Sequence, residues 1–260
     1  MSYPVCPKCG HAPLPVDQSL PAACPACGIV LAKFAAAPVR ASQANVEDES
    51  HAGSFLARWL LHVPSEVARA SWYGRMAALA LLALYTIKIF SDTDIKYGDL
   101  GGVFLSKALL PWHEAGHLIF RPFGEFMTIL GGTLAQHLFP IILGLALLIK
   151  RRDPFGASLA FWLLGYSMIY TGWYMHDAGD PQAMMVSGKS SAEDDGHDWV
   201  NLFSYMGGWW LLHAIGIGIF VARVGQAMMC LGLAWGACMV WLQKERLSDS
   251  PFAESPVDRE

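Results

Sequence analysis

Long apolar runs alternate along this chain with short polar segments. Four runs contain no Asp, Glu, Lys or Arg: 127–149, 155–175, 199–222 and 224–243. A fifth run, 72–90, contains only Arg75 and Lys88, which can extend toward the interfaces of a membrane. Each run has about 19 to 24 residues, enough for a helix to cross the hydrocarbon core of a bilayer. The pattern predicts membrane helices over these five runs.

A sixth segment, 103–123, is moderately apolar but contains ionisable residues, His113 and Glu114 among them. Such groups are costly at membrane depth and usually serve a function there. The pattern leaves open whether this segment spans the membrane or re-enters it. The predicted fold is therefore mostly α, a polytopic helical membrane protein with about five or six membrane helices.

Composition supports this interpretation. The chain has 260 residues, of which 54% are hydrophobic and 15% charged, against about 25% charged in soluble domains. These values exclude a disordered protein and argue against an ordinary soluble enzyme. The net charge of −4 gives no general attraction to nucleic acid. Basic residues divide equally between the two predicted sides, so the positive-inside rule gives no orientation.

The first 34 residues contain two near-copies of Cys-Pro-x-Cys-Gly, with 14 residues between Cys9 and Cys24. Two such knuckles are typical of a tetrahedral zinc site with four thiolates. The sequence predicts a zinc ribbon over residues 1–34, with structural Zn²⁺ on Cys6, Cys9, Cys24 and Cys27. Its thiols favour a reducing, cytoplasmic location. With only Lys8 and Lys33 as basic residues, the ribbon is expected to dock a protein rather than nucleic acid.

The rest of the chain divides into three parts. Residues 35–71 are predicted to be a flexible linker followed by a possible interfacial helix. Residues 72–243 form the membrane domain, and 244–260 a flexible tail. Cys230 and Cys238 are expected to pack as small apolar groups.

The segment 111–117 reads Pro-Trp-His-Glu-Ala-Gly-His and contains a His-Glu-x-x-His motif. On a helix, His113 and His117 share one face and can bind a single Zn²⁺. Glu114 is then the predicted general base, acting on a water whose pKa zinc lowers toward ~7. The motif predicts a catalytic zinc site.

Catalytic zinc usually has a third protein ligand. Asp177 is the favoured candidate because it ends an uncharged helix, where a carboxylate has no evident structural role. His197 is the main competitor. Asp198 could be the N-cap of the helix that follows it. Alternatively, His197 and Asp198 could lie behind the zinc ligands as a proton relay.

Two further polar features interrupt apolar runs. Gly131 and Gly132 could expose backbone groups to which a substrate adds as a strand. Gln136 and His137 are expected to be hydrogen-bond partners between helices.

The motif at 113–117 in a membrane segment, the Gly-rich start of the next helix and a later Asp resemble the site-2 protease family of intramembrane zinc metalloproteases. The resemblance covers roughly residues 100–200 and is greatest to bacterial members. It implies a bacterial inner-membrane enzyme that binds zinc through His113, His117 and an Asp, uses Glu114 as base, and hydrolyses a membrane-protein or peptide substrate. The family places Gly directly after the ligand Asp, whereas Ala178 follows Asp177.

That difference keeps two alternatives open. One is an inactive membrane scaffold or sensor that retains zinc. The other is a zinc hydrolase acting on another amphiphilic substrate, because the same motif would serve that chemistry.

Overall fold

The computed structural model describes residues 4–6, 8–18, 22–31, 55–92, 100, 103–183, 185, 187–193 and 195–249. The chain divides into two compact units, Met1–Ala52 and Gly53–Glu260. The predicted flexible linker over 35–54 lies outside the described residues, as does the end of the predicted tail, 250–260.

The first unit consists mainly of turns. The carbonyl oxygens of Cys6 and Cys24 accept hydrogen bonds from the N–H groups of Gly10 and Gly28, both at 2.9 Å. These glycines have φ of 73° and 72°, a left-handed conformation that glycine adopts at little cost. The two Cys-Pro-x-Cys-Gly copies therefore form equivalent tight turns, and Cys6, Cys24 and Leu31 make a small core.

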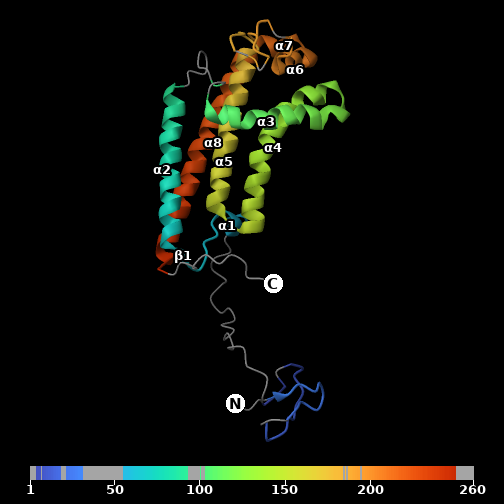
Figure 1. Ribbon diagram of the computed structural model, residues 1–260, viewed down its shortest axis with the longest axis vertical. Coiled ribbons are helices and arrows are strands. Elements are labelled where there is room, and N and C mark those ends of the chain that lie inside the picture. Colours follow the sequence, from blue (N-terminus) through green and yellow to red (C-terminus); the bar gives the residue numbers. More distant parts are fainter. Residues whose placement is uncertain are drawn as a thin grey trace. The chain divides into compact units, whose positions relative to one another are not determined.

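The second unit is mostly helical (Figure 1). Its elements are α1 (Phe55–Leu60), β1 (Val67–Ala68), α2 (Arg69–Asp92), α3 (Phe104–Phe120), η2 (Arg121–Phe123), α4 (Glu125–Arg151), α5 (Pro154–Asp177), α6 (Asp198–Met206), α7 (Gly208–Leu212), α8 (Ala214–Gln243), η3 (Lys244–Arg246) and β2 (Leu247–Ser248).

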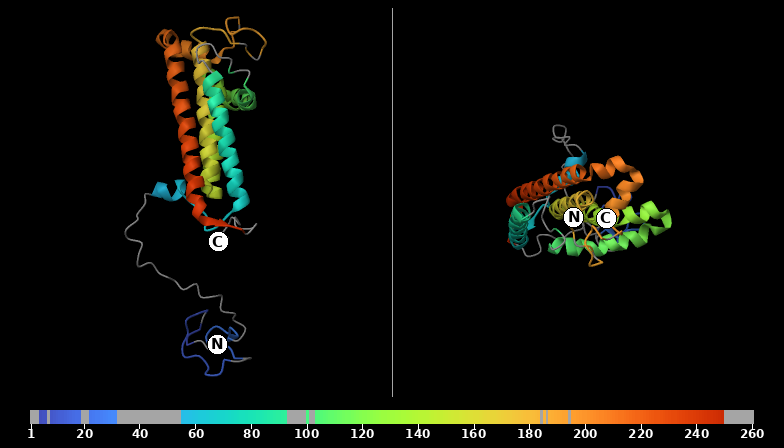
Figure 2. Two further views of the ribbon diagram at one scale, coloured as in Figure 1. Left: turned by 90° about the vertical axis from the view of Figure 1, so that its left-hand side faces the viewer. Right: turned by 90° about the horizontal axis from the view of Figure 1, so that it is seen from above.

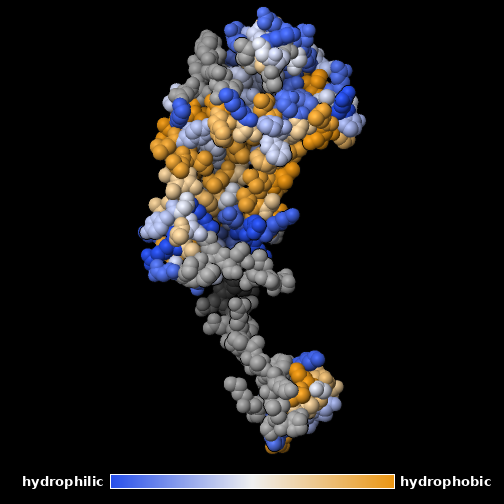
Figure 3. All heavy atoms as spheres, in the orientation of Figure 1, coloured by the Kyte–Doolittle hydropathy of each residue, from blue (hydrophilic) through white to orange (hydrophobic). Residues whose placement is uncertain are grey.

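Three helices in the described part of the chain are long and apolar enough to cross a membrane: Arg69–Ser91, Glu125–Arg151 and Ala214–Arg246. They correspond to α2, α4 and α8, and α5 runs alongside them with 24 residues (Figures 1 and 2). This supports a membrane protein. Large apolar side chains of these helices are exposed, as expected for lipid contact, and Figure 3 shows an apolar belt between polar ends.

The prediction of separate spans over 199–222 and 224–243 is wrong. Gly207, with φ of 112°, ends α6, and α7 ends before His213. The helix α8 then continues for 30 residues through Arg223. Arg223 does not interrupt it because the side chain is exposed and donates a hydrogen bond to Gln226 Oε1 at 2.8 Å on the same helix.

The segment 103–123 forms α3 and η2, and α3 lies across the bundle rather than along it (Figure 1). With 17 residues, α3 is also short for a membrane crossing. It lies at the end of the bundle where α5 ends and α8 begins, and this arrangement brings its histidines close to α6.

Small residues hold α5 against α8. A Cβ atom at Gly172 of α5 would lie 2.5 Å from the backbone N of Ala222, and one at Gly218 of α8 would lie 2.4 Å from the carbonyl oxygen of Gly172. Glycine at both positions lets the two backbones approach closely, as is typical of helix pairs in membranes. This packing fixes the last part of α5 against the first part of α8, at the end of the bundle where α3 lies.

The opposite end of the bundle joins the two ends of this unit. β1 pairs with β2 in parallel, Val67 with Leu247 and Ala68 with Ser248. Within the predicted tail, residues 244–248 form η3 and β2, and β2 pairs with β1, a partner that is remote in the sequence.

Candidate metal centre

The helix α3 presents His113 and His117 on one face, toward α4. His113 Nδ1 lies 3.3 Å from Gln136 Oε1, and His117 Nδ1 lies 2.8 Å from the carbonyl oxygen of Thr128. Both acceptors belong to α4. Each imidazole is therefore held through Nδ1, and this leaves both Nε2 atoms directed to the same space, where His113 and His117 form an edge-on ring pair with centroids 4.9 Å apart.

These contacts determine which ring nitrogen carries the proton. A carbonyl oxygen only accepts, so His117 Nδ1 must donate to Thr128. The amide of Gln136 donates from Nε2 to Ser167 Oγ at 3.0 Å, so its Oε1 faces His113 as an acceptor. In their neutral forms, both histidines thus present an unprotonated Nε2, which is the form that binds a metal.

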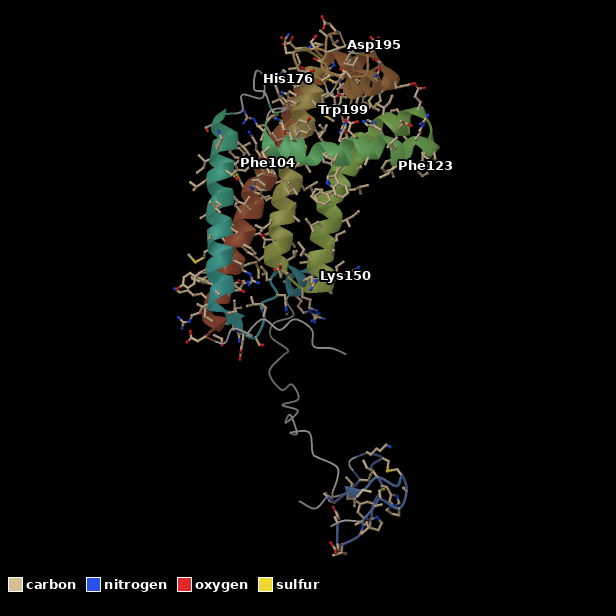
Figure 4. The ribbon with its side chains drawn as sticks, viewed as in Figure 1. Phe104, Phe123, Lys150, His176, Asp195 and Trp199 are labelled. Carbon is tan, nitrogen blue, oxygen red and sulfur yellow. The ribbon has the colours of Figure 1, made fainter. Side chains whose placement is uncertain are left out.

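Asp198 completes the cluster from the first turn of α6. Its Oδ2 lies 2.9 Å from His113 Nε2 and 3.4 Å from His117 Nε2. All three side chains offer ligand atoms within 4.8 Å of one another and could hold a metal ion. In Figure 4, the neighbouring Trp199 lies near α3, between the labelled Phe104 and Phe123.

The favoured third ligand, Asp177, is not part of this cluster, and neither is its competitor, His197. Asp177 Oδ1 accepts hydrogen bonds from the backbone N–H groups of Gln182 and Ala183, at 2.7 and 2.8 Å. His197 Nδ1 accepts from Val200 N–H, so His197 Nε2 donates to Asp177 Oδ2 at 3.1 Å. This pair closes the loop between α5 and α6.

The contact between His197 and Asp177 also positions Asp198, which directly follows His197 in the chain. The ring of His197 stacks on Tyr174 with centroids 4.3 Å apart, and the Asp198 backbone N–H donates to the Tyr174 hydroxyl at 3.3 Å. His197 therefore lies against Asp177 outside the cluster, whereas Asp198, which was predicted beside it, is part of the cluster. The alternative that Asp198 is the N-cap is wrong, because His197 caps α6 and Asp198 is its first helical residue, with the carboxylate directed to the histidines.

Two glycines of α4 make room for the histidines. A Cβ at Gly132 would lie 2.6 Å from His117 Nε2 and 2.7 Å from His113 Nε2, and one at Gly131 would lie 2.6 Å from the carbonyl oxygen of Gly116. Both glycines are buried inside α4. The prediction that they expose backbone to a substrate strand is therefore wrong, because that backbone faces α3.

The predicted roles of Gln136 and His137 are confirmed. Gln136 joins α3, α4 and α5 through His113 and Ser167, and His137 Nε2 lies 3.1 Å from Thr171 Oγ1 of α5. Thr128 was not predicted. It acts through its backbone carbonyl, which every residue type has, so the sequence carries no signal for it.

The charges in the cluster depend on one another. Burial raises the pKa of Asp198, but hydrogen bonds with His113 and His117 outweigh burial and leave that pKa below its usual value. The contact with Asp198 raises the pKa of His117 to about 9. Glu114 is exposed, three residues before His117 on α3, and is therefore on a neighbouring face of the helix.

A second candidate metal group lies in the first unit. The thiols of Cys6, Cys9, Cys24 and Cys27 have sulfur atoms within 4.8 Å of one another. Cys6 Sγ lies 3.6 Å from Cys27 Sγ, and Cys9 Sγ lies 3.8 Å from Cys24 Sγ. The structure thus brings together the four predicted cysteines as a group that could hold a metal ion.

Comparison of the chain with protein-family models, with curated proteins and with solved structures finds no match. The function is therefore argued from the geometry of the two metal groups and from the apolar helices around one of them.

Proposed function

We propose that this protein is an intramembrane zinc hydrolase that cuts a peptide bond of a membrane-protein or peptide substrate. His113, His117 and Asp198 hold the catalytic Zn²⁺, and Glu114 is the general base. Cys6, Cys9, Cys24 and Cys27 hold a structural Zn²⁺ in a small ribbon. One observation carries the proposal: two imidazole Nε2 atoms with no proton in the neutral form face one carboxylate oxygen at 2.9 and 3.4 Å.

This arrangement needs positive charge between the three groups, either a proton, as the raised pKa of His117 indicates, or a metal ion. Two nitrogen lone pairs and a carboxylate repel one another unless protons or a metal ion lie between them. A tetrahedral zinc with bonds of about 2.0–2.1 Å places its ligand atoms about 3.3–3.4 Å apart. The distance of 3.4 Å between His117 Nε2 and Asp198 Oδ2 fits that spacing, and 2.9 Å at His113 is somewhat shorter. Two histidines and one carboxylate are also a common ligand set of catalytic zinc.

When bound, Zn²⁺ supplies a Lewis acid that makes water a nucleophile near neutral pH. The chain supplies the remaining groups. Glu114 follows His113 directly and is exposed, so its carboxylate is available to take a proton from the attacking water and to return it to the leaving amine. The buried pair of His197 and Asp177 keeps Asp198 in place while the exposed face of α3 receives the substrate.

The proposed orientation places the ribbon in the bacterial cytoplasm. We propose that α2, α4, α5 and α8 all cross the membrane, which puts both ends of this unit on one side. That end carries eight described basic residues: Arg58, Arg69, Arg75, Lys150, Arg151, Arg152, Lys244 and Arg246. The opposite end carries five: Lys88, Lys107, Arg121, Lys189 and Arg223. The positive-inside rule then favours the first end as cytoplasmic and puts the metal centre near the outer face.

The test is cleavage by Glu114→Gln in the full chain, reconstituted in liposomes with a library of single-span membrane proteins. The variant is expected to retain two zinc ions per chain and to lose about 10²–10⁴-fold in cleavage rate. Glu125→Gln is the matched control, since it makes the same change of charge at the start of the neighbouring helix, outside the metal cluster. Equal cleavage by both variants would contradict the mechanism. If the parent binds zinc but cuts no peptide bond, the result would favour one of the two alternatives: an inactive membrane scaffold or a zinc hydrolase of another amphiphilic substrate.

A further inference from the structure

The end of the bundle opposite the metal centre contains a basic pocket. Arg58 and Trp59 of α1, His62 and Arg152 line a cavity of about 280 Å³. Figure 4 labels Lys150 at this end, far from His176 at the metal end. The two arginines are exposed and the two rings are half-buried, so the pocket has a cationic rim and a partly apolar wall.

Contacts with the bundle hold this pocket in shape. Trp235 Nε1 of α8 donates a hydrogen bond to the Leu60 carbonyl oxygen at 2.8 Å, which fixes α1 to the bundle. The guanidinium carbon of Arg152 lies 5.8 Å from the centre of the Trp59 ring, within the range of a cation–π contact. Two elements remote in the sequence therefore bring their basic groups together.

Both arginines of the pocket lack an acidic partner among the described residues, where neither Arg58 nor Arg152 forms an ion pair with a carboxylate. The nearest acid in the sequence, Asp153, instead accepts a hydrogen bond from Gly156 N–H at 3.1 Å at the start of α5. Burial and the charge of Arg152 lower the pKa of His62, as expected where basic groups converge.

The backbone of Arg152 gives a second, independent sign. Its φ is 47°, and among the described residues no other non-glycine residue has positive φ. It occupies the left-handed position that ends α4, where glycine is the usual residue. An arginine there is unfavourable for the backbone, and such strain is often found at functional sites.

We infer that this pocket binds the phosphate of an anionic membrane lipid. Guanidinium groups suit phosphate oxygens because they can donate two parallel hydrogen bonds. A lipid is the favoured source because apolar neighbours of the lining residues in the sequence are exposed: Leu60 and Leu61, between Trp59 and His62, are 36% and 45% exposed, and Ile149 near the end of α4 is 57% exposed. Such side chains at the edge of a membrane helix contact acyl chains while the arginines reach the headgroup layer.

The experiment uses the full chain in neutral detergent micelles doped with phosphatidylglycerol or phosphatidylcholine, with bound lipid measured by native mass spectrometry. The parent is expected to retain phosphatidylglycerol in preference to phosphatidylcholine. Arg58→Gln with Arg152→Gln should weaken retention by about 25-fold, at roughly fivefold per arginine. Lys150→Gln with Arg151→Gln removes the same charge from the same end of α4, outside the pocket, and is expected to retain nearly the parental affinity.

Arg152→Gly separates binding from folding, because glycine relieves the left-handed backbone while removing the guanidinium. It should lose about fivefold in phosphatidylglycerol affinity with an unchanged or higher unfolding temperature. Equal loss in the two double variants would overturn the inference, since it would indicate a diffuse charge effect. Displacement of the lipid by inorganic phosphate at equal concentration would also overturn it, because the pocket would then be a site for free phosphate.

Discussion

Nε2 of His113 lies 2.9 Å from Oδ2 of Asp198, although 85 residues separate the two in the chain. The contact joins the middle of α3 to the first turn of α6. It replaces the expected contact with Asp177, and it makes the two acidic residues of this region experimentally distinguishable.

Asp198→Ala should remove the metal of the membrane unit, since it deletes one of three ligands. Asp177→Asn should instead lower affinity by about 10–100-fold, as is usual for a residue that orients a ligand. Zinc content by plasma mass spectrometry and competition with a chelator measure both effects. Asp180→Asn, in the same loop, is the control and should retain parental zinc. Loss of zinc from Asp177→Asn but not from Asp198→Ala would contradict the assignment.

Gly132→Ala should abolish metal binding in the membrane unit while leaving the helices intact. The new Cβ would lie within 2.7 Å of both Nε2 atoms, so the imidazoles would have to turn away. Gly144→Ala on the same helix meets Ala160 Cβ at 3.3 Å and the carbonyl oxygen of Ala157 at 3.9 Å, and is the matched control. Circular dichroism and zinc content should separate them: both variants are helical, but only Gly144→Ala retains both metals. A Gly132→Ala protein with two zinc ions would show that the space above Gly132 is not needed.

Gly172→Ala should destabilise the bundle by about 1–3 kcal/mol, the usual cost of overpacking. The added methyl would meet the backbone of α8 at Ala222 N and Gly218 O, both at 2.5 Å, and neither can rotate away. Unfolding in mixed micelles measures the change. A Cβ at Gly216 on α8 meets nothing within 4 Å, so Gly216→Ala should be neutral or stabilise by up to about 1 kcal/mol. Equal stability of the two variants would argue against close α5–α8 packing.

Cys6→Ser with Cys24→Ser should remove one zinc per chain and leave the membrane metal in place. Four thiolates hold a structural zinc jointly, and a unit with so small a core depends on the metal to fold. Limited proteolysis should then cleave within residues 1–34 faster than in the parent. Cys230→Ser with Cys238→Ser should change neither zinc content nor proteolysis, because both thiols are exposed on α8. If the parent binds a single zinc ion and the variant with Cys6→Ser and Cys24→Ser still binds it, the prediction of a zinc site in the ribbon is contradicted.

The features that depend on near neighbours in the chain could be predicted from the sequence. His113 and His117 are one helical turn apart, so helical periodicity places them on one face. Each cysteine knuckle brings its own two thiols together through a tight turn. For 199–222, apolar composition predicted one span, but Gly207 and His213 divide the segment into α6, α7 and the start of α8. The acidic neighbour of the two histidines could not be predicted either: Asp177 was favoured, with His197 as its competitor, and the folded loop brings Asp198 to them instead.

The sequence by itself determined a membrane-type composition, a cysteine-rich head and a His-Glu-x-x-His helix, since all three depend on which residues are near neighbours in the chain. Only the tertiary structure decided that α3 lies across the bundle, that Gly132 opens the space between the histidines, and that Asp198 rather than Asp177 faces them. The physical reason is that these relationships depend on backbone approach between helices and on the hydrogen bonds that close a loop. Asp177 gives both oxygens to its own loop and to His197, and Asp198 is the carboxylate that faces His113 and His117.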